Sequence, residues 1–333
     1  MDERDLQVLE QYPFAVNDLR RVRGAYLLDT DTGLKLLREC PLSVKRLALE
    51  QSLLTHLRRQ GFSADLLVPD REGNLVSVYR ERFPYMVKEQ PDGRECDTKN
   101  ESEILRAVSL LAELHLALRC PEFAGAEGLK FCGRDTRKEM QRHNRELRKI
   151  YTFMKKKNRK NEFESACLSC FPEVIAEAER SERQLQTSAY KSLREQALAE
   201  GHFCHGEYIH HNILMNGGKM TVVNFEKFSL DVQINDLSLF MIKILEKQDY
   251  DSRLGKRMLE AYGRKKPLSA AERAYLSVCL GYPEKFRKLV NYYYNTNKAW
   301  IPGKHMEKLE KFLSQREKRI SFSEEIGYTE LNI

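Results

Sequence analysis

The sequence predicts an α+β fold in which a small β-rich lobe precedes a larger, mainly helical lobe. Three observations support this fold class. About the first 90 residues alternate short apolar runs with turn residues and contain one amphipathic helix. Beyond them, apolar residues recur at helical spacing for most of the chain. One stretch, 202–228, interrupts the helical pattern and returns to apolar β runs.

The first lobe, predicted to span 1–88, is built from short strands around one helix. A hairpin is expected at 22–38, because Thr30-Asp31-Thr32-Gly33 separates two apolar runs. An amphipathic helix is expected at 44–59, with Leu47, Leu54 and Leu57 on one side. Further strands are predicted at 64–68 and 76–85. The segment 79–87 is either a connector that holds adenine through its backbone or a plain linker between lobes.

The second lobe is predicted to span 89–333. Helices are expected at 101–119, 134–158 and 173–200, and again from the end of the β stretch to about residue 319. Within the β stretch, Asn216-Gly217-Gly218 joins two apolar runs, which is a strong hairpin signal. The helical lobe therefore carries a loop and hairpin at 204–226.

Length and composition exclude several classes of protein. A chain of 333 residues exceeds the usual size of one hydrophobic core, and 41% hydrophobic residues exclude a mainly disordered protein. No stretch reaches the ~18 consecutive apolar residues of a membrane span, and the acidic start lacks the apolar core of a signal peptide. We therefore expect synthesis in the cytosol. Eight cysteines are too sparse for a disulfide scaffold, and Cys167 and Cys170 are interpreted as ordinary thiols.

The positive charge is concentrated in one segment. The formal net charge is +7, yet 134–160 alone holds twelve basic and three acidic side chains, so the rest of the chain is slightly acidic. Three interpretations of this basic helix stay open. It is a solvated helix face, a contact surface for an anionic protein or polysaccharide, or a nucleic-acid site. The last is the weakest, because few aromatic residues accompany the charges.

The segment from His205 to Glu226 carries the chemistry. An acid at Glu207 is followed by Asn212 and, after the hairpin, by Asn224 and Glu226. This order suits phosphoryl transfer, in which an acidic side chain orients and deprotonates a hydroxyl while oxygen ligands hold Mg²⁺ against nucleotide phosphates. His205 is expected to brace the loop by hydrogen bonding. The adjacent His210 and His211 would point to different sides, so a zinc site is not predicted.

The motif resembles a known loop. His-Gly-Glu-x-x-x-x-Asn-Ile-Leu is similar to the His-Gly-Asp-x-x-x-x-Asn loop of the aminoglycoside phosphotransferase and choline kinase superfamily. Val-Val-Asn-Phe-Glu (222–226) resembles that superfamily's Ile-Asp-Phe-Asp/Glu, and Asp236-Leu falls at its structural Asp-Leu. Within the superfamily, segments 134–164, 282–289 and 292–300 resemble the CotS-type spore coat family, including its YutH-like members.

This resemblance implies a two-lobed, protein-kinase-like fold with a defined set of site residues. Its catalytic residues would be Glu207, Asn212 and His205. Its metal ligands would be Asn212, Asn224 and Glu226.

The resemblance also implies a phosphate-binding cation in the first lobe. Gly33-Leu-Lys-Leu-Leu-Arg38 resembles the family's Gly-x-x-x-Leu-Lys, so Arg38 falls at the position of the cofactor-binding lysine. Lys35 is the alternative, although an offset of three places it on the opposite strand face. Glu50 is the helix acid expected to pair with this cation.

Three of these positions depart from the superfamily's pattern. Glu207 replaces an aspartate, and a displacement of about 1 Å at a reacting group can cost ~10²-fold in rate. Asn224 replaces a metal-binding aspartate, although Mg²⁺ favours charged oxygens. Arg38 replaces a lysine, and its planar fork does not substitute for lysine at a tight site.

The sequence therefore leaves open whether the protein is an enzyme. The main interpretation is a spore coat protein that is catalytically impaired and acts in coat assembly. It would be made in the mother-cell cytosol and deposited on the spore, and it would contact other coat proteins or an anionic coat or cortex polymer through 134–160. The alternative is an active small-molecule or sugar kinase that uses ATP and Mg²⁺ and binds a small-molecule acceptor. No cofactor is expected if the chain is inactive.

Overall fold

The computed structural model describes residues 7–22, 24–80, 82–125, 128–295 and 302–328. One compact unit comprises the described residues up to 131 together with 200–230. The second comprises the described residues of 132–199 and those from 231 onward. The predicted lobe boundary between residues 88 and 89 divides the chain differently and stays a prediction. Residues 296–300, part of one segment used in the family resemblance, lie outside the described residues.

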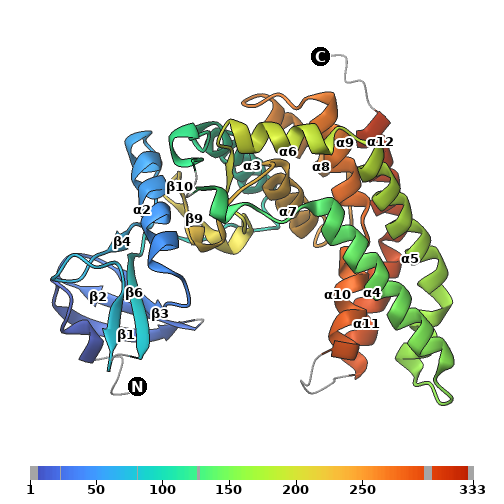
Figure 1. The fold of residues 1–333 in the computed structure, drawn as a ribbon, viewed down its shortest axis with the longest axis horizontal. Coiled ribbons are helices and arrows are strands. Elements are labelled where there is room, and N and C mark those ends of the chain that lie inside the picture. The colour runs from blue at the N-terminus through green and yellow to red at the C-terminus, as the bar shows by residue number, and fades with distance from the viewer. Residues whose placement is uncertain (1–6, 23, 81, 126–127, 296–301, 329–333) are drawn as a thin grey trace. The chain divides into compact units, whose positions relative to one another are not determined.

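The first unit is built on an antiparallel sheet near the N-terminus (Figure 1). Its strands are β1 (Val16–Val22), β2 (Ala25–Thr30), β3 (Lys35–Glu39), β4 (Leu67–Val68), β5 (Ser77–Tyr79) and β6 (Phe83–Glu89). They lie in the order β1-β2-β3-β6-β4, and β5 also pairs with β6. The predicted hairpin of β2 and β3 is confirmed. The predicted single strand 76–85 is wrong, because the chain turns at Arg80, which has a φ of 49°.

The two faces of this sheet have different neighbours. Leu37 of β3 and Val87 of β6 are cross-strand partners on a face packed with aromatic side chains from the chain's start. Because successive strand residues point to opposite sides, Arg38, Met86 and Lys88 share the other face. Met86 packs there with Leu47 of the following helix. This alternation directs two cations towards that helix.

Helix α2 (Val44–Arg59) has the predicted bounds. Its N-cap is Ser43, whose side chain accepts a hydrogen bond from the Arg46 backbone N–H. Its buried side is apolar except for Glu50, which is fully buried. A buried carboxylate needs a partner of opposite charge, so α2 supplies one half of an internal ion pair.

The remaining β structure of the first unit surrounds the 205–226 segment. Strand β9 (Ile213–Asn216) pairs with β10 (Lys219–Val222) as the predicted hairpin, and β7 (Arg94–Glu95) adds a third strand. Strands β8 (Phe203–Cys204) and β11 (Ser229–Leu230) bracket this segment as an antiparallel pair. Helix α3 (Glu101–Ala117) matches the predicted helix at 101–119 and begins after the N-cap Asn100.

The second unit is helical throughout its described part. Its helices are α4 (Thr136–Lys156), α5 (Glu162–Thr187), α6 (Tyr190–Ala199), α7 (Ile234–Leu245), α8 (Ser252–Gly263), α9 (Ala270–Gly281), α10 (Glu284–Asn295), α11 (Pro302–Ser314) and α12 (Arg316–Tyr328). Helix α4 packs along α5, and α9 packs against α12 and α7. None of the described helices is long and apolar enough to cross a membrane. The concentration of strands in the first unit confirms the α+β class.

The predicted helix at 173–200 is wrong at its start and in its continuity. Helix α5 begins eleven residues earlier, because Asn161 and Glu164 form a reciprocal capping box. The helix continues through Pro172 and ends at Thr187, after which α6 is a separate helix. Cys167 and Cys170 are buried free thiols within α5.

Candidate functional site

The 205–212 loop is stabilised by the buried ring of His205. The Glu207 backbone N–H donates to His205 Nδ1 at 3.1 Å, so the proton is on Nε2, which donates to the Val223 carbonyl at 3.0 Å. The ring also packs on Phe225, with centroids 4.4 Å apart. His205 therefore connects the start of the loop to the segment after the hairpin.

Gly206 is required by close backbone packing in this loop. Its φ is 80°, and a Cβ atom there would lie 1.9 Å from the Lys227 carbonyl oxygen. Only glycine occupies such a position without displacing the neighbouring chain. The loop and the 224–228 turn are consequently in backbone contact.

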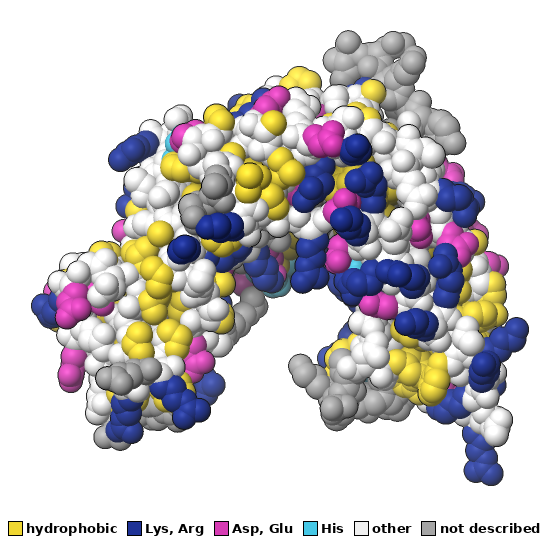
Figure 2. All heavy atoms as spheres, in the orientation of Figure 1, with side chains coloured by type: hydrophobic (Ala, Val, Ile, Leu, Met, Phe, Trp, Pro, Cys, Tyr) yellow, Lys and Arg dark blue, Asp and Glu magenta, His cyan; other side chains and the backbone are white. Residues whose placement is uncertain are grey.

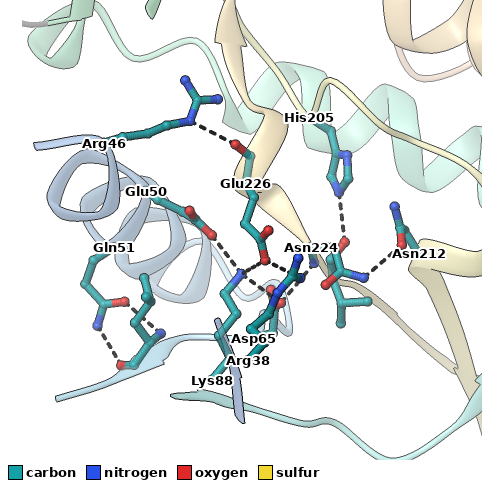
Figure 3. Close-up of polar contacts among 12 residues, drawn as sticks. Arg38, Arg46, Glu50, Gln51, Asp65, Lys88, His205, Asn212, Asn224 and Glu226 are labelled. Atoms are coloured by element: carbon teal, nitrogen blue, oxygen red, sulfur yellow. Dashed lines mark hydrogen bonds and ion pairs between the residues drawn. The ribbon is translucent and has the colours of Figure 1, made fainter. Parts of the chain in front are cut away.

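The hairpin β9-β10 returns the chain so that Asn224 meets Asn212 (Figure 3). Asn224 has a left-handed backbone, with φ 66° and ψ 56°, a conformation that asparagine tolerates well. Its side-chain Nδ2 donates to Asn212 Oδ1 at 2.9 Å. Asn212 Nδ2 in turn donates to the Glu207 carbonyl at 2.9 Å. Two of the three predicted metal-ligand positions are thus hydrogen-bonded to each other.

Lys88 is the central cation of the site. Its ammonium lies 2.7 Å from Glu50, 3.2 Å from Asp65 and 3.8 Å from Glu226, and only 1% of its side chain is exposed (Figure 3). Burial opposes its charge, but attraction to Asp65, Glu50 and Glu226 raises the pKa of Lys88 above its usual value. Lys88 is therefore a buried ammonium surrounded by carboxylates.

The predicted cofactor-binding residues do not form the expected pair. Glu50 pairs with Lys88, whereas Arg38 bonds Glu226 at 2.7 Å. Lys35 lies on the other face of β3, where its ammonium donates to the Thr32 carbonyl and lies over the Phe14 ring. Burial, followed by repulsion from Asp65 and Glu226, raises the pKa of Glu50 despite the attraction of Lys88.

The 224–228 turn is also bonded through its backbone to α2 and to the segment before β4. Asp65 Oδ2 accepts from the Asn224 backbone N–H at 2.9 Å. Arg46 donates to the carbonyls of Glu226 and Phe228, and its guanidinium lies 4.3 Å from the Phe228 ring centre. The turn that follows the hairpin is therefore bonded to other parts of the same chain at several points.

The predicted base, Glu207, forms a half-exposed ion pair. Lys227 Nζ lies 2.7 Å from its carboxylate. Of the two neighbouring histidines, His211 pairs with Glu95 through Nδ1 and His210 is buried. Their ring centroids lie 3.9 Å apart, so the expectation that the two rings point to different sides is wrong. Among the described His, Cys, Asp and Glu side chains, the one group of three that could hold a metal is His56, Cys120 and Glu122, and Glu226 is not part of it.

The residues at 212, 224 and 226 do not fit a Mg²⁺–nucleotide site. Asn212 Oδ1 already accepts from an amide, and Asn224 offers one neutral oxygen. Glu226, the carboxylate of this set, is bonded to Arg38 and lies beside Lys88. Mg²⁺ requires near-octahedral oxygen ligands and favours carboxylates. This set has one carboxylate, which already lies beside two cations, so it lacks the negative charge that the ion needs.

Sequence reasoning missed Lys88, Asp65 and Arg46. One signal for Lys88 was available, since it directly continues the apolar run Tyr85-Met86-Val87 within a strand. Asp65 lies 159 residues from its partner Asn224 and carried no local signal. Arg46 lies one helical turn before Glu50, on the same side of α2, which is a weak signal.

Comparison with known proteins identifies the family. The family described as "Spore coat putative kinase YutH" matches residues 6–326. The chain belongs to this YutH spore coat family. It is 20% identical over 337 residues to spore coat protein S of Bacillus subtilis (strain 168), covering 96% of this chain and 93% of that protein. The predicted resemblance to CotS-type and YutH-like proteins is confirmed.

Solved structures give the fold of this YutH-family chain. An aminoglycoside phosphotransferase from Alicyclobacillus acidocaldarius has a TM-score of 0.84 at 17% identity, covering 96% of this chain and 94% of the other. The amicoumacin kinase hAmiN, solved with AMP-PNP and Ca²⁺, has a TM-score of 0.64 at 14% identity, with the same coverage. The fold is therefore of the aminoglycoside phosphotransferase type, as predicted. The catalytic, cofactor and metal roles assigned to individual residues stay predictions.

Proposed function

We propose that this protein is a spore coat component whose kinase-like site no longer transfers phosphate efficiently and which acts in coat assembly through contacts with other coat components. Membership of the YutH family and the likeness to spore coat protein S support the location. The observation that carries the loss of activity is the hydrogen bond between Asn224 and Asn212.

The charges around Lys88 support the same conclusion. Phosphoryl transfer depends mainly on cations that stabilise the transferred group. Here the ammonium of Lys88 is directed at Glu50, Asp65 and Glu226, and Arg38 is bonded to Glu226. A single lysine–glutamate pair is compatible with nucleotide binding in active kinases. Here, however, a triphosphate would meet three carboxylates around Lys88, and one of them, Glu226, is also bonded to Arg38. The site is better suited to stabilising the fold than to holding a nucleotide.

The first experiment is a thermal shift of the purified chain with ATP and Mg²⁺, together and separately. A ligand at about 100 times its Kd stabilises a folded protein by about 2.7 kcal/mol, which is a shift of several degrees for a chain of this size. We expect no shift and no ATP turnover. A clear thermal shift, together with ATP turnover that the Glu207→Ala variant loses, would instead establish the kinase alternative. Its acceptor would then still have to be identified.

A reversion tests whether the substitutions cause the inactivity. The double variant Glu207→Asp with Asn224→Asp restores both superfamily carboxylates, and we expect it to gain Mg²⁺-dependent ATP binding. Asn158→Asp, at an exposed position in the second unit, is the control for added negative charge. If the reverted protein still ignores ATP while remaining folded, features other than these two residues block the site.

A further inference from the structure

The basic segment has a defined exposed surface in the second unit. Figure 2 shows Lys and Arg side chains gathered over the region that α4 occupies in Figure 1. Part of the segment's charge is neutralised locally. Arg142 pairs with Glu139 and Glu146, Arg148 pairs with Glu179, and Lys157 pairs with Glu164.

Other cations of the segment have no such partner. Among the residues that the structure describes, no ion pair to a carboxylate involves Lys138, Arg145, Lys149, Lys155, Lys156, Arg159 or Lys160. All seven side chains are exposed. Arg145, Lys149 and Lys156 follow one another at spacings of four and seven, so they lie along one side of α4. This side has an uncompensated positive charge.

An apolar side chain lies within this charged surface. Phe153 is 59% exposed, and its ring packs edge-on against Tyr294 of α10, with centroids 5.3 Å apart. A shallow groove of about 610 Å³ surrounds it. The groove is lined by Arg148, Lys149, Thr152, Phe153, Lys156 and Lys157. The Phe153 ring is held in place by Tyr294 and is surrounded by cationic side chains. It therefore offers a rigid apolar surface with positive charges around it.

We propose that this α4 surface, defined by Arg145, Lys149, Phe153 and Lys156, binds an acidic protein segment that inserts an apolar side chain beside Phe153. The proposal rests on the assembly role proposed above and names the chemistry of the partner. Charge complementarity selects an anionic occupant. Phe153 selects a peptide with an apolar side chain over a polyphosphate, which has no apolar surface to place on an exposed aromatic ring. A single-stranded nucleic acid would need several stacking rings, and the groove contains one.

The probes are two labelled twelve-residue peptides rich in glutamate, identical except for a central Phe or Ala. Binding to the full-length chain is measured by fluorescence anisotropy at several salt concentrations. We expect the Phe peptide to bind several-fold more tightly than the Ala peptide, and both affinities to fall with salt. Failure of both peptides to bind at low salt would overturn the proposal.

Matched variants assign the binding to this surface. The triple variant Arg145→Gln, Lys149→Gln and Lys156→Gln should weaken the Phe peptide about tenfold, since each surface ion pair contributes a few tenths to 1 kcal/mol. The control triple Lys45→Gln, Arg59→Gln and Lys99→Gln removes the same charge from exposed positions in the first unit. Equal weakening by the two triples would overturn the proposal.

Phe153→Ala should abolish the difference between the two peptides while leaving the Ala peptide's affinity unchanged. Polyphosphate and oligo-dT are the competing probes, and tighter binding of either than of the Phe peptide would identify a general polyanion surface and overturn the proposal.

The ATP thermal shift on the same proteins separates this inference from the proposed function. ATP turnover by the unmodified chain contradicts the proposed function alone, whereas loss of peptide selectivity contradicts this inference alone.

Discussion

The side-chain amide of Asn224 donates a 2.9 Å hydrogen bond to the side-chain oxygen of Asn212. An aspartate at position 224 could not donate this bond. Two acceptor oxygens would face each other, and a cation between them would be needed to relieve the repulsion. The amide of Asn224 therefore makes a direct contact that an aspartate at this position could not make.

Asn224→Asp should consequently make the protein's stability depend on divalent cations. Without a metal we expect a loss of about 1–2 kcal/mol, the typical cost of leaving a buried polar group without its partner. Mg²⁺ or Mn²⁺ should recover part of that loss in the variant and leave the unmodified chain unchanged. Chemical denaturation with and without the ion measures both. If the stability of the Asn224→Asp variant did not respond to Mg²⁺ or Mn²⁺, a cation could not take the place of the hydrogen bond between residues 212 and 224.

Lys88→Met should be strongly destabilising, because it leaves Glu50 and Asp65 buried without their cation. Breaking one side of a buried ion pair costs about 3–5 kcal/mol. The control is Lys35→Met, which replaces a second buried lysine. Lys35 donates to the Thr32 carbonyl, and in the described part of the chain it forms no ion pair with a carboxylate. It should cost much less. Similar losses in urea denaturation would show that the carboxylates around Lys88 are dispensable.

Gly206→Ala tests the backbone contact between the loop and the 224–228 turn. The alanine Cβ would clash with the Lys227 carbonyl, so we expect a loss of more than 2 kcal/mol. Gly73→Ala has a similar φ of 87° but meets no atom within 4 Å, and it reports the cost of backbone strain alone. The loss in melting temperature of Gly206→Ala beyond that of Gly73→Ala measures the clash with the Lys227 carbonyl. Equal losses in the two variants would mean that the 224–228 turn moves away from the new Cβ atom.

Glu164 is predicted to make the corner between α4 and α5 sensitive to acid. Burial favours its neutral form, but hydrogen bonds from Lys157, the Asn161 backbone, Tyr294 and Tyr293 outweigh burial and lower the pKa of Glu164. An acid with a lowered folded-state pKa stabilises the fold above its ordinary pKa of about 4.3, and that contribution is lost as the pH falls through the lowered value.

Glu164→Gln should therefore cost about 2 kcal/mol at pH 7 and progressively less below pH 4. The control is Glu162→Gln, at the exposed first residue of α5, which should show little change at either pH. Denaturation at pH 7 and at pH 3.5 gives the comparison. A penalty that stays constant with pH would rule out the lowered pKa as the cause.

Local signals explain what the sequence could predict. The leucine spacing of α2, together with the Ser43 cap, defines the helix. The Asn216-Gly217-Gly218 turn defines the hairpin, with both glycines at positive φ. The order of the motif residues also predicted that Asn212 and Asn224 would meet. Each of these depends on neighbours a few residues apart.

The ion cluster could not be predicted in the same way. Whether Glu50 meets Arg38 or Lys88 depends on the pairing of β3 with β6, where Arg38 faces Met86 and Lys88 faces Leu36. Both cations lie on the α2 side of the sheet, and the distances across that face decide the pairing. Such a choice depends on three-dimensional packing that no short sequence pattern encodes.

The hydrogen bond between Asn224 and Asn212 also bears on which substitutions the site tolerates. An asparagine codon and an aspartate codon differ by one nucleotide, so an aspartate at position 224 is one mutation away. That mutation removes the hydrogen-bond donor at once, while Glu207 and Arg38 would still differ from the superfamily's pattern. Selection for a stable fold is by itself enough to keep Asn224 in place.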